Sequence, residues 1–342
     1  MSPKNLNAKI KIPKLLKINL DNKKISQIFK KFEKSLIIKE NFIVAVSGGP
    51  DSLALAYLAK IYALKYNLIV KFIIIDHKLR LESTKEARKV KKILKDFYIE
   101  SKILTWRGPK LDKNTQACAR KERYNLLFKE CKKYEIRNIL LAHHQDDLLE
   151  NFFIRILRGS GLKGLISLNK KTNIDNINLL RPLLDQKKED LIFLSKKVFN
   201  FFVIDPTNKD DKYQRVKIRN LIMELNNNGL DKRKLIKTIE NLKDSDFVVN
   251  FYVNKNLKKN SFFSLKSKKL ILNNDFFQQP YEIIFRSFSE TINSIGKKYY
   301  PPRGKKLDRL IKNIKKNRSF RATLGGCVIE KCNQTVIISK EG

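Results

Sequence analysis

Imidazole and carboxylate side chains gather in one short stretch of an otherwise basic chain. His143, His144, Asp146, Asp147 and Glu150 lie within eight residues. Asp147 and Glu150 are three residues apart, so on a helix they share a face and could bind Mg²⁺ or a substrate ammonium group. A single aspartate would be explained by its stabilising effect on a helix amino terminus, but three carboxylates are explained less well. We therefore predict a cation-binding site here, with His143 or Asp146 assisting metal binding or proton transfer.

A glycine-containing turn is the second stretch suited to chemistry. It consists of Ser47, Gly48, Gly49, Pro50, Asp51 and Ser52. An apolar run precedes it and a helical pattern follows it, so unpaired helix amides and two glycines would let a phosphate approach the backbone closely. The turn lacks the Gly-Lys-Ser/Thr ending of a Walker A loop and the Gly-x-Gly-x-x-Gly pattern of dinucleotide-binding folds. Strand-to-helix turns often carry glycine for structural reasons, so Gly48-Gly49 alone would not define a site.

Length and charge limit the class of protein. The chain has 342 residues and 73 Lys and Arg against 34 Asp and Glu, a formal net charge of +39. This charge favours a nucleic-acid partner, although heavy use of Lys, Ile and Asn throughout the chain indicates that compositional drift contributes. The four cysteines form no Cys-x-x-Cys pair. Apolar runs fall far short of the ~20 residues that cross a membrane, so we expect a cytoplasmic protein without membrane contact.

The pattern along the first two thirds of the chain predicts an α/β fold. Short apolar runs typical of buried strands occur at 42–46, 69–75, 99–104 and 138–142. Amphipathic stretches typical of helices occur at 53–66, 84–97, 114–134 and 146–157. This alternation predicts a parallel sheet with helices on both faces. The glycine turn and the acidic stretch each follow a strand, so both should lie at the carboxyl edge of the sheet.

Three regions are expected. Residues 1–40 form a basic N-terminal extension with a docking helix near 25–38. Residues 41–212 form the α/β domain, with a last strand at 201–204. Residues 213–342 form a smaller, mainly helical domain with hairpin-like pieces at 262–272 and 322–339. The last region is Lys-rich and is the expected nucleic-acid-binding part. For its aromatic residues a core role is expected: Phe251, Tyr252, Phe262, Phe263, Tyr299 and Tyr300. A homodimer is compatible with the sequence.

The string from Ser47 to Ser52 closely resembles the PP-loop, Ser-Gly-Gly-x-Asp-Ser, of the N-type ATP pyrophosphatase family. The resemblance implies that ATP adenylates a carbonyl oxygen, pyrophosphate leaves, and an amine or sulfur nucleophile displaces AMP. The amides of Gly48, Gly49 and Ser52 would hold the pyrophosphate portion. Mg²⁺ would offset the charge of the leaving group, with Asp51 and Asp146 as its candidate ligands.

Other segments resemble, within that family, the tRNA(Ile)-lysidine synthases. Residues 143–150 match their His-His-x-Asp-Asp-x-x-Glu-Thr motif, except that Asn151 stands in the Thr position. Residues 76–80 resemble an Asp-His-Gly-Leu-Arg segment, with Lys78 in place of glycine. Residues 119–124 resemble an Ala-Arg-x-x-Arg-Tyr helix on which Arg120 and Arg123 share a face and either contact phosphates or are solvated. Further ordered matches lie at 158–165, 181–184, 205–208 and 215–220, and more loosely at 320–327.

The resemblance implies an enzyme that uses ATP and L-lysine to form lysidine at the wobble cytidine of tRNA(Ile) with anticodon CAU, through an adenylated cytidine. Asp147 and Glu150 would recognise lysine. The implied catalytic residues are Asp51, His143, Asp146, Asp147 and Glu150. One alternative is another PP-loop tRNA modifier such as a cytidine thiolase, which usually carries the paired cysteines that this chain lacks. Another is a noncatalytic, basic RNA-binding protein.

Overall fold

The computed structural model describes residues 12–78, 82–106, 108, 115–204, 212, 214–297 and 302–342. Within them the chain divides into two compact units, residues 1–235 and 236–342. Each unit is described by itself. The expected motif at 205–208, together with Arg80, Tyr299 and Tyr300, lies outside the described residues. The expected domain boundary at residue 212 falls beside undescribed residues and stays a prediction.

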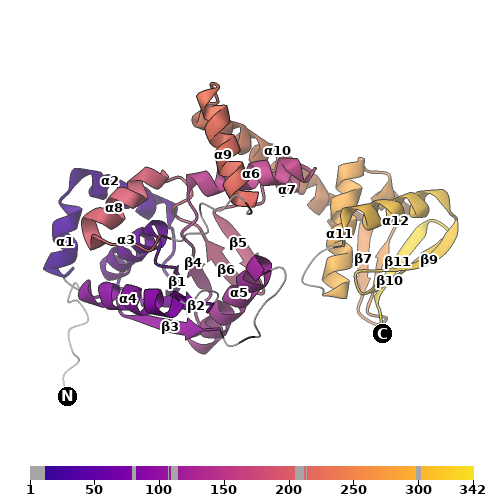
Figure 1. The fold of residues 1–342 in the computed structure, drawn as a ribbon. Helices are drawn as coiled ribbons and strands as arrows, with labels where there is room; N and C mark the ends of the chain where they lie inside the picture. Colours follow the sequence, from indigo (N-terminus) through magenta and orange to yellow (C-terminus); the bar gives the residue numbers. More distant parts are fainter. Residues whose placement is uncertain are drawn as a thin grey trace, which may run out of the picture. The chain divides into compact units, whose positions relative to one another are not determined.

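The first unit is built on a six-stranded sheet with strand order β3-β2-β1-β4-β6-β5 (Figure 1). The strands are β1 (Phe42–Val46), β2 (Val70–Asp76), β3 (Ser101–Thr105), β4 (Asn138–Leu140), β5 (Lys171–Ile174) and β6 (Ile177–Leu180). Neighbouring strands are parallel except for β5 and β6, which form an antiparallel hairpin at one edge. The α/β fold class predicted from the sequence is confirmed, whereas the hairpin strand β5 was not predicted.

Helices cover both faces of this sheet because successive residues of each buried strand point to opposite sides. On β1, Phe42 and Val44 belong to the core that includes α3, whereas Ile43 packs in a second core with Leu127 of α5. The helices of the first core are α1 (Lys14–Leu20), α2 (Lys23–Ser35), α3 (Pro50–Tyr66), α4 (Ser83–Asp96) and α8 (Lys188–Phe199). The others in this unit are α5 (Thr115–Lys133), α6 (Gln145–Leu157), α7 (Leu162–Leu165) and α9 (Gln214–Asn227).

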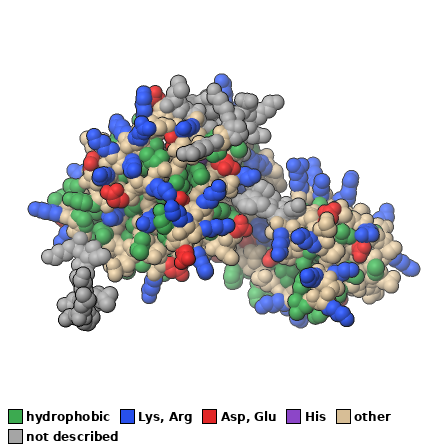
Figure 2. Space-filling view, turned by 90° about the horizontal axis from the view of Figure 1, so that it is seen from below, with side chains coloured by type: hydrophobic (Ala, Val, Ile, Leu, Met, Phe, Trp, Pro, Cys, Tyr) green, Lys and Arg blue, Asp and Glu red, His purple; other side chains and the backbone are tan. Residues whose placement is uncertain are grey.

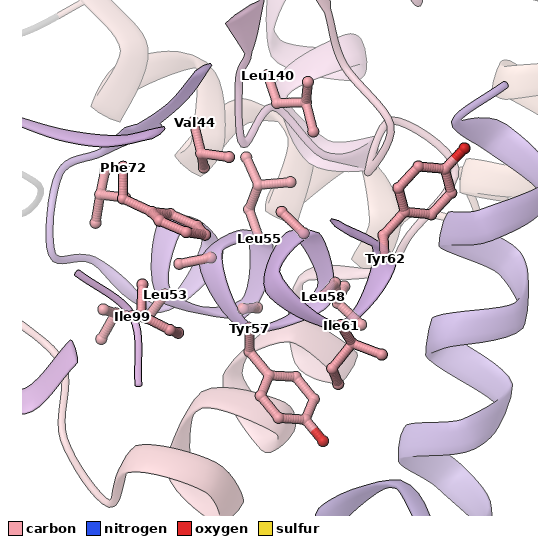
Figure 3. Packing of buried hydrophobic residues seen from close by; sticks show 14 of the residues in the cluster. Val44, Leu53, Leu55, Tyr57, Leu58, Ile61, Tyr62, Phe72, Ile99 and Leu140 are labelled. Carbon is pink, nitrogen blue, oxygen red and sulfur yellow. The ribbon is translucent and has the colours of Figure 1, made fainter. Parts of the chain in front are cut away.

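Helix α3 is apolar on all sides, as expected for a helix surrounded by other elements. Figure 3 shows Leu55 near Val44 and Leu140 of the sheet, while Tyr57 points to the opposite side. The Tyr57 hydroxyl donates to the carbonyl oxygen of Leu16 at 2.9 Å, which ties α1 to α3. The helix that follows the glycine turn is therefore held firmly in the core, and the turn has a fixed position.

The second unit combines helices with an antiparallel sheet. Helix α10 (Lys232–Asn260) begins in the first unit and continues into the second. The sheet has the order β7-β8-β11-β10-β9, with β7 (Ser261–Ser264), β8 (Lys269–Leu272), β9 (Ser319–Leu324), β10 (Cys327–Cys332) and β11 (Thr335–Lys340). The short 3₁₀ helix η2 (Asn274–Phe277) follows β8, and the helices α11 (Tyr281–Gly296) and α12 (Gly304–Lys316) share an apolar core with the sheet. The expected hairpins are present and join into one sheet.

Two expectations are wrong. Residues 201–204 form no strand; the backbone N–H of Val203 instead donates to the carbonyl oxygen of Gly48 at 2.9 Å. Four aromatic side chains for which a core role was expected are exposed: Phe251, Tyr252, Phe262 and Phe263. Basic side chains are spread over the visible face of each unit in Figure 2, in keeping with the charge of the chain. Within the described ranges, no helix has the length and apolar character to cross a membrane.

Candidate active site

The glycine turn joins the carboxyl end of β1 to the amino end of α3. Gly48 has a φ of +88°, a backbone conformation that L side chains rarely adopt. A Cβ atom at this position would lie 2.7 Å from Cγ2 of Val90 and 3.1 Å from Cγ2 of Val203. Position 48 therefore requires glycine both for its conformation and for the space around it.

Ser52 closes the turn on itself. Its hydroxyl accepts the backbone N–H groups of Gly48 at 3.0 Å and Ser47 at 3.2 Å, and it donates to the carbonyl oxygen of Gly49 at 2.9 Å. In this structure the Gly48 amide, expected to bind pyrophosphate, is thus directed to Ser52. Helix α3 begins at Pro50 without a side-chain cap. The amides of its first turn, at Asp51 and Ser52, are therefore suited to receive an anion.

The acidic stretch begins helix α6, and its first residues lock one another in place. The Nδ1 atom of His144 accepts the backbone N–H of Asp146 at 3.2 Å. In return, Oδ2 of Asp147 accepts the backbone N–H of His144 at 3.0 Å. This is a reciprocal capping box, with histidine in the position that serine or threonine usually takes. The cap fixes the His144 ring and the Asp147 carboxylate relative to the end of β4.

The glycine turn and the acidic helix meet at the His144 imidazole. Its Nε2 atom lies 3.5 Å from Oδ2 of Asp51 and 3.5 Å from Oδ2 of Asp147. His144 is buried, with 5% of its surface exposed. The structure thus brings two predicted site residues, Asp51 and Asp147, to one imidazole, although their strand ends are about ninety positions apart in the sequence. His144 itself was not among the predicted site residues.

The electrostatics of this group place a proton on Nε2 of His144. Burial lowers the pKa of His144, but the carboxylates of Asp51, Asp147 and Asp146 outweigh burial, so the pKa lies above its usual value. The amide of Asp146 points at Nδ1, so in the neutral ring this nitrogen is the acceptor and the proton lies on Nε2. The N–H of Nε2 therefore faces two carboxylates. Burial raises the pKa of Asp147, but the nearby His144 and His143 rings and the His144 amide lower it overall, so this carboxylate is ionised.

Each carboxylate of α6 has a basic partner on α9 or at the start of α10. The pairs are Asp146 with Lys232 at 3.2 Å, Asp147 with Arg215 at 3.9 Å, and Glu150 with Arg219 at 2.5 Å. Sequence reasoning did not place these three cations in the site. Arg215 and Arg219 are four residues apart, so they share one face of a helix, and this spacing could have indicated that both belong to the site.

Glu150 differs from the two aspartates in its surroundings. It is only 3% exposed, and its two oxygens accept Nε of Arg219 at 2.5 Å and the second guanidinium nitrogen at 3.5 Å. A carboxylate paired in this way already has the cation that burial demands. Its role in lysine recognition stays a prediction.

His143 lies close enough to Arg120 of α5 for the charge of that arginine to act on its ring. Burial, opposed by Asp147 and aided by the Arg181, Arg120 and Arg215 cations, lowers the pKa of His143 to about 3. The ring is therefore neutral near pH 7. Its Nδ1 atom is buried and has no hydrogen-bond partner among the described residues.

Arg123 lies beside His77, which directly follows the end of β2. Its Nε donates to Nε2 of His77 at 3.3 Å, while Arg120 donates to the Tyr124 hydroxyl at 3.3 Å. Burial and the Arg123 cation lower the pKa of His77 to about 4. The two arginines are thus neighbours of different histidines, and phosphate contacts by either one stay a prediction.

The turn after β2 accommodates Lys78 at the position where the resembled motif has glycine. Lys78 has a φ of +50°, so the backbone keeps a left-handed conformation although the residue is lysine. The Asp76 carboxylate holds this turn by accepting the Lys78 amide at 3.0 Å and the Thr84 hydroxyl at 2.6 Å. These contacts offset the strain of a non-glycine residue at this position.

The donor set suits a metal ion that is bound partly by substrate. No three His, Cys, Asp or Glu side chains converge as a metal site in the described part of the chain. Oδ1 of Asp51 is buried without a hydrogen-bond partner among the described residues. Protein-bound Mg²⁺ commonly uses one or two carboxylates together with phosphates and water. Asp51 therefore fits a Mg²⁺ ion that accompanies ATP.

Comparisons with known proteins agree with this geometry. The PP-loop domain family matches residues 19–226. A tRNA(Ile)-lysidine synthase of Wolbachia pipientis wMel is 33% identical over 307 residues, covering 87% of this chain and 70% of that protein. One of Orientia tsutsugamushi (strain Boryong) is 34% identical over 310 residues, covering 87% and 69%. Among solved structures, the U34-tRNA thiolase of Methanococcus maripaludis has a TM-score of 0.54 at 19% identity, covering 64% of this chain and 79% of that one, which shows the shared fold.

The fold, the glycine turn and the match over most of the first unit define a PP-loop protein. Within that class, the chain belongs to the tRNA(Ile)-lysidine synthase family. The resemblance drawn from the motifs is therefore confirmed. The four cysteines do not gather into one group: Cys118 and Cys131 lie on α5, and Cys327 and Cys332 lie at the two ends of β10.

Proposed function

We propose that this enzyme joins L-lysine to the wobble cytidine of tRNA(Ile) with anticodon CAU, at the expense of ATP. Membership of the lysidine synthase family supports an ATP-dependent, tRNA-modifying enzyme. One observation carries the site assignment. The His144 ring lies between Asp51 of the PP-loop and Asp147 of the acidic helix α6, and so connects the two segments. An anion site and a cation site lie side by side there, as a reaction between ATP and an amine requires.

In the first step, the 2-oxo oxygen of the cytidine attacks the α-phosphorus of ATP and pyrophosphate leaves. The amino end of α3 would hold the departing pyrophosphate, because its first amides and the helix dipole favour an anion. The cytidine then carries AMP on O2 as a leaving group. For this step the base must be unstacked from the anticodon loop to reach the pocket.

Where Mg²⁺ is bound, Asp51 is the residue proposed to hold it, and the ion would offset the negative charge of the pyrophosphate. Asp146 was predicted as a second ligand. Its observed partner is the Lys232 ammonium group, however, and that contact favours a role in binding amines. We therefore assign Asp51 to the phosphate side of the site and Asp146 to the amine side.

In the second step, the ε-amine of lysine attacks C2 of the adenylated cytidine, and AMP leaves with the electron pair of the broken C–O bond. Free lysine carries two ammonium groups and one carboxylate, so its site must offer both signs of charge. Asp146 and Asp147 supply the negative charge and Arg215, 3.9 Å from Asp147, supplies positive charge. An ammonium cannot attack, so a proton must leave first. We propose His143 as the acceptor of a hydrogen bond from the amine, because its ring is neutral and its Nδ1 has no hydrogen-bond partner among the described residues.

Glu150 is proposed as a positioning residue. Its carboxylate fixes Arg219, and through it helix α9, against α6. This differs from the direct contact with lysine predicted from spacing alone. The difference follows from burial, because a 3% exposed carboxylate with a guanidinium partner is poorly placed to receive a second cation.

Helix α12 is the surface of the second unit that we propose for contact with tRNA phosphates. Its buried residues Leu307, Leu310, Ile311 and Ile314 fix one face in the core. The opposite face exposes Lys305, Lys306, Arg309, Lys312, Lys315 and Lys316. Such a row of cations would bind the RNA backbone without reading its sequence. The predicted cytoplasmic location and homodimer stay predictions.

The test is lysine transfer by the purified full-length chain. ATP, radiolabelled L-lysine and a tRNA(Ile) transcript with anticodon CAU are supplied, and label in the tRNA is measured together with pyrophosphate and AMP. A transcript with uridine at the wobble position is the matched control and should remain unlabelled. Release of pyrophosphate without lysine transfer would instead support another PP-loop tRNA-modifying reaction. If neither transcript reacts and no pyrophosphate is released, the result would support a noncatalytic RNA-binding protein.

A further inference from the structure

Lys232 is a charged residue at the site that the proposed reaction does not use. It lies at the first position of α10, and its Nζ atom is 3.2 Å from Oδ1 of Asp146. The Lys232 side chain is 38% exposed and that of Asp146 is 26% exposed. The pair therefore lies at the rim of the site, within reach of a solute.

The two other carboxylates of α6 are paired with arginine. The guanidinium of Arg219 reaches both oxygens of Glu150, so that contact is directional and mostly shielded from water. Lys232 instead presents a primary ammonium group on a flexible four-carbon stem. This is the same chemical group, on the same stem, as the ε-ammonium of free lysine.

We infer that Lys232 competes with the ammonium group of substrate lysine: it forms an ion pair with Asp146 until free lysine displaces it. The inference rests on the proposed function. An ion pair this exposed contributes little free energy, so an incoming ammonium can replace it. Competition from a tethered lysine lowers the apparent affinity for free lysine, because only the fraction of enzyme with Asp146 open can bind it. Lys232 is thus a residue that sets the lysine concentration at which the enzyme works.

The start of α10 has its own anchor, so Lys232 can be changed without loss of the helix. Asp231 accepts the backbone N–H of Arg233 at 2.8 Å and pairs with its guanidinium at 3.1 Å. These contacts do not involve Lys232. We expect K232Q to keep the fold, and its thermal unfolding midpoint should stay near that of the wild type.

The experiment compares the KM for lysine in the wild type, K232Q, K232R and the control K237Q, with ATP and tRNA held at saturation. Lys237 is an exposed residue of the same helix, so K237Q removes the same charge away from Asp146. The expected result is a two- to fivefold lower KM for lysine in K232Q, about the range that loss of an exposed ion pair allows. The kcat and the KM for ATP should not change. K237Q should match the wild type, and K232R, which keeps a cation beside Asp146, should not lower the KM for lysine.

A KM for lysine that is unchanged or raised in K232Q would overturn the inference; a rise would mean that Lys232 helps to bind substrate. An equal fall in K237Q would overturn it as well, since the effect would then follow total charge. Isothermal titration of each variant with lysine, in the presence of a nonhydrolysable ATP analogue and tRNA, should give the same order of affinities. A wild-type enzyme that transfers no lysine at all would overturn the proposed function, and with it this inference.

Discussion

Nε2 of His144 lies 3.5 Å from a carboxylate oxygen of Asp51, so one imidazole connects the PP-loop to the acidic helix. The same ring caps α6 through Nδ1, which accepts the Asp146 amide at 3.2 Å. His144 therefore has two separable roles, one in the stability of the helix and one in the alignment of two carboxylates. A substitution that keeps the first role can reveal the second.

His144→Asn should separate these roles. Asparagine caps helices well, so the helix keeps an acceptor for the Asp146 amide, but its shorter side chain cannot reach Asp51. We expect lysine transfer to fall at least tenfold while the unfolding midpoint stays near that of the wild type. His144→Ala loses the cap as well and should be less stable by about 1 kcal/mol. Steady-state kinetics and thermal unfolding of both variants check this, and wild-type turnover in His144→Asn would contradict an aligning role.

The adjacent glycines of the PP-loop should respond differently to alanine. Gly48 combines a φ of +88° with a Cβ position only 2.7 Å from Val90, so Gly48→Ala should destabilise the protein by about 1–3 kcal/mol. Gly49 has a φ of −69°, and a Cβ there would meet only Ser47 Oγ at 3.9 Å. Gly49→Ala should therefore change stability by less than about 0.5 kcal/mol.

If the backbone of the turn approaches the phosphates, Gly49→Ala should still raise the KM for ATP. Chemical denaturation and ATP titration of the two variants give both readouts. An ATP KM unchanged in Gly49→Ala would place the phosphates away from this part of the turn.

Breaking the Glu150–Arg219 pair should cost stability. Glu150→Gln leaves the Arg219 cation facing a neutral amide in a mostly buried place, and about 2 kcal/mol is expected to be lost. Glu150→Gln combined with Arg219→Gln removes both members of the pair and should recover part of that loss. Thermal unfolding of the single and double variants measures it. Equal losses that simply add in the double variant would show that the two side chains do not interact.

The sequence allowed the fold and half of the site to be predicted because the signals were local. A strand followed by a glycine turn and a helix specifies where Ser47 to Ser52 must lie. The carboxyl ends of parallel strands share one edge, so Asp51 and Asp147 could be expected close together. The edge hairpin was missed, although Asp175 and Asn176 both have positive φ, the conformation of a tight hairpin turn that these residue types favour.

Lys232, the third cation of the site, could not be predicted in the same way. With 73 Lys and Arg in the chain, no local pattern distinguishes Lys232 from its neighbours. Its partner Asp146 is 86 positions away, and only the packing of the following helices brings them together. Val203 was also mispredicted because its partner is distant in the sequence. Its apolar run resembled a strand, but its backbone N–H donates to Gly48 in the turn and not to a neighbouring strand.

The stability of the protein should fall in mild acid through His77. Burial and Arg123 lower its pKa to about 4, against the ordinary 6.5 that an unfolded chain would show. Between these values the unfolded chain binds a proton that the folded chain does not, so the contribution of His77 is full above pH 6.5 and is lost as the pH falls toward 4.

His77→Asn keeps an acceptor for Arg123 and removes this titration. The wild type should lose about 2 kcal/mol more than the variant between pH 7 and 4.5, measured by urea unfolding across that range. Other histidines titrate in both proteins and cancel in the difference. Parallel pH profiles of the two proteins would show that His77 has the same pKa in the folded and the unfolded chain.

The basic face of α12 should contribute measurably to tRNA binding. Lys305→Gln, Arg309→Gln and Lys316→Gln together remove three exposed charges from this helix and leave its buried face intact. If each contacts a phosphate, the slope of log affinity against log salt should become shallower by about 2, at roughly 0.7 per contact. The matched control removes Lys91, Lys92 and Lys95 from the exposed side of α4, in the first unit. Equal changes in both triple variants would mean that the high charge of the chain acts diffusely, and that α12 is no special surface for RNA.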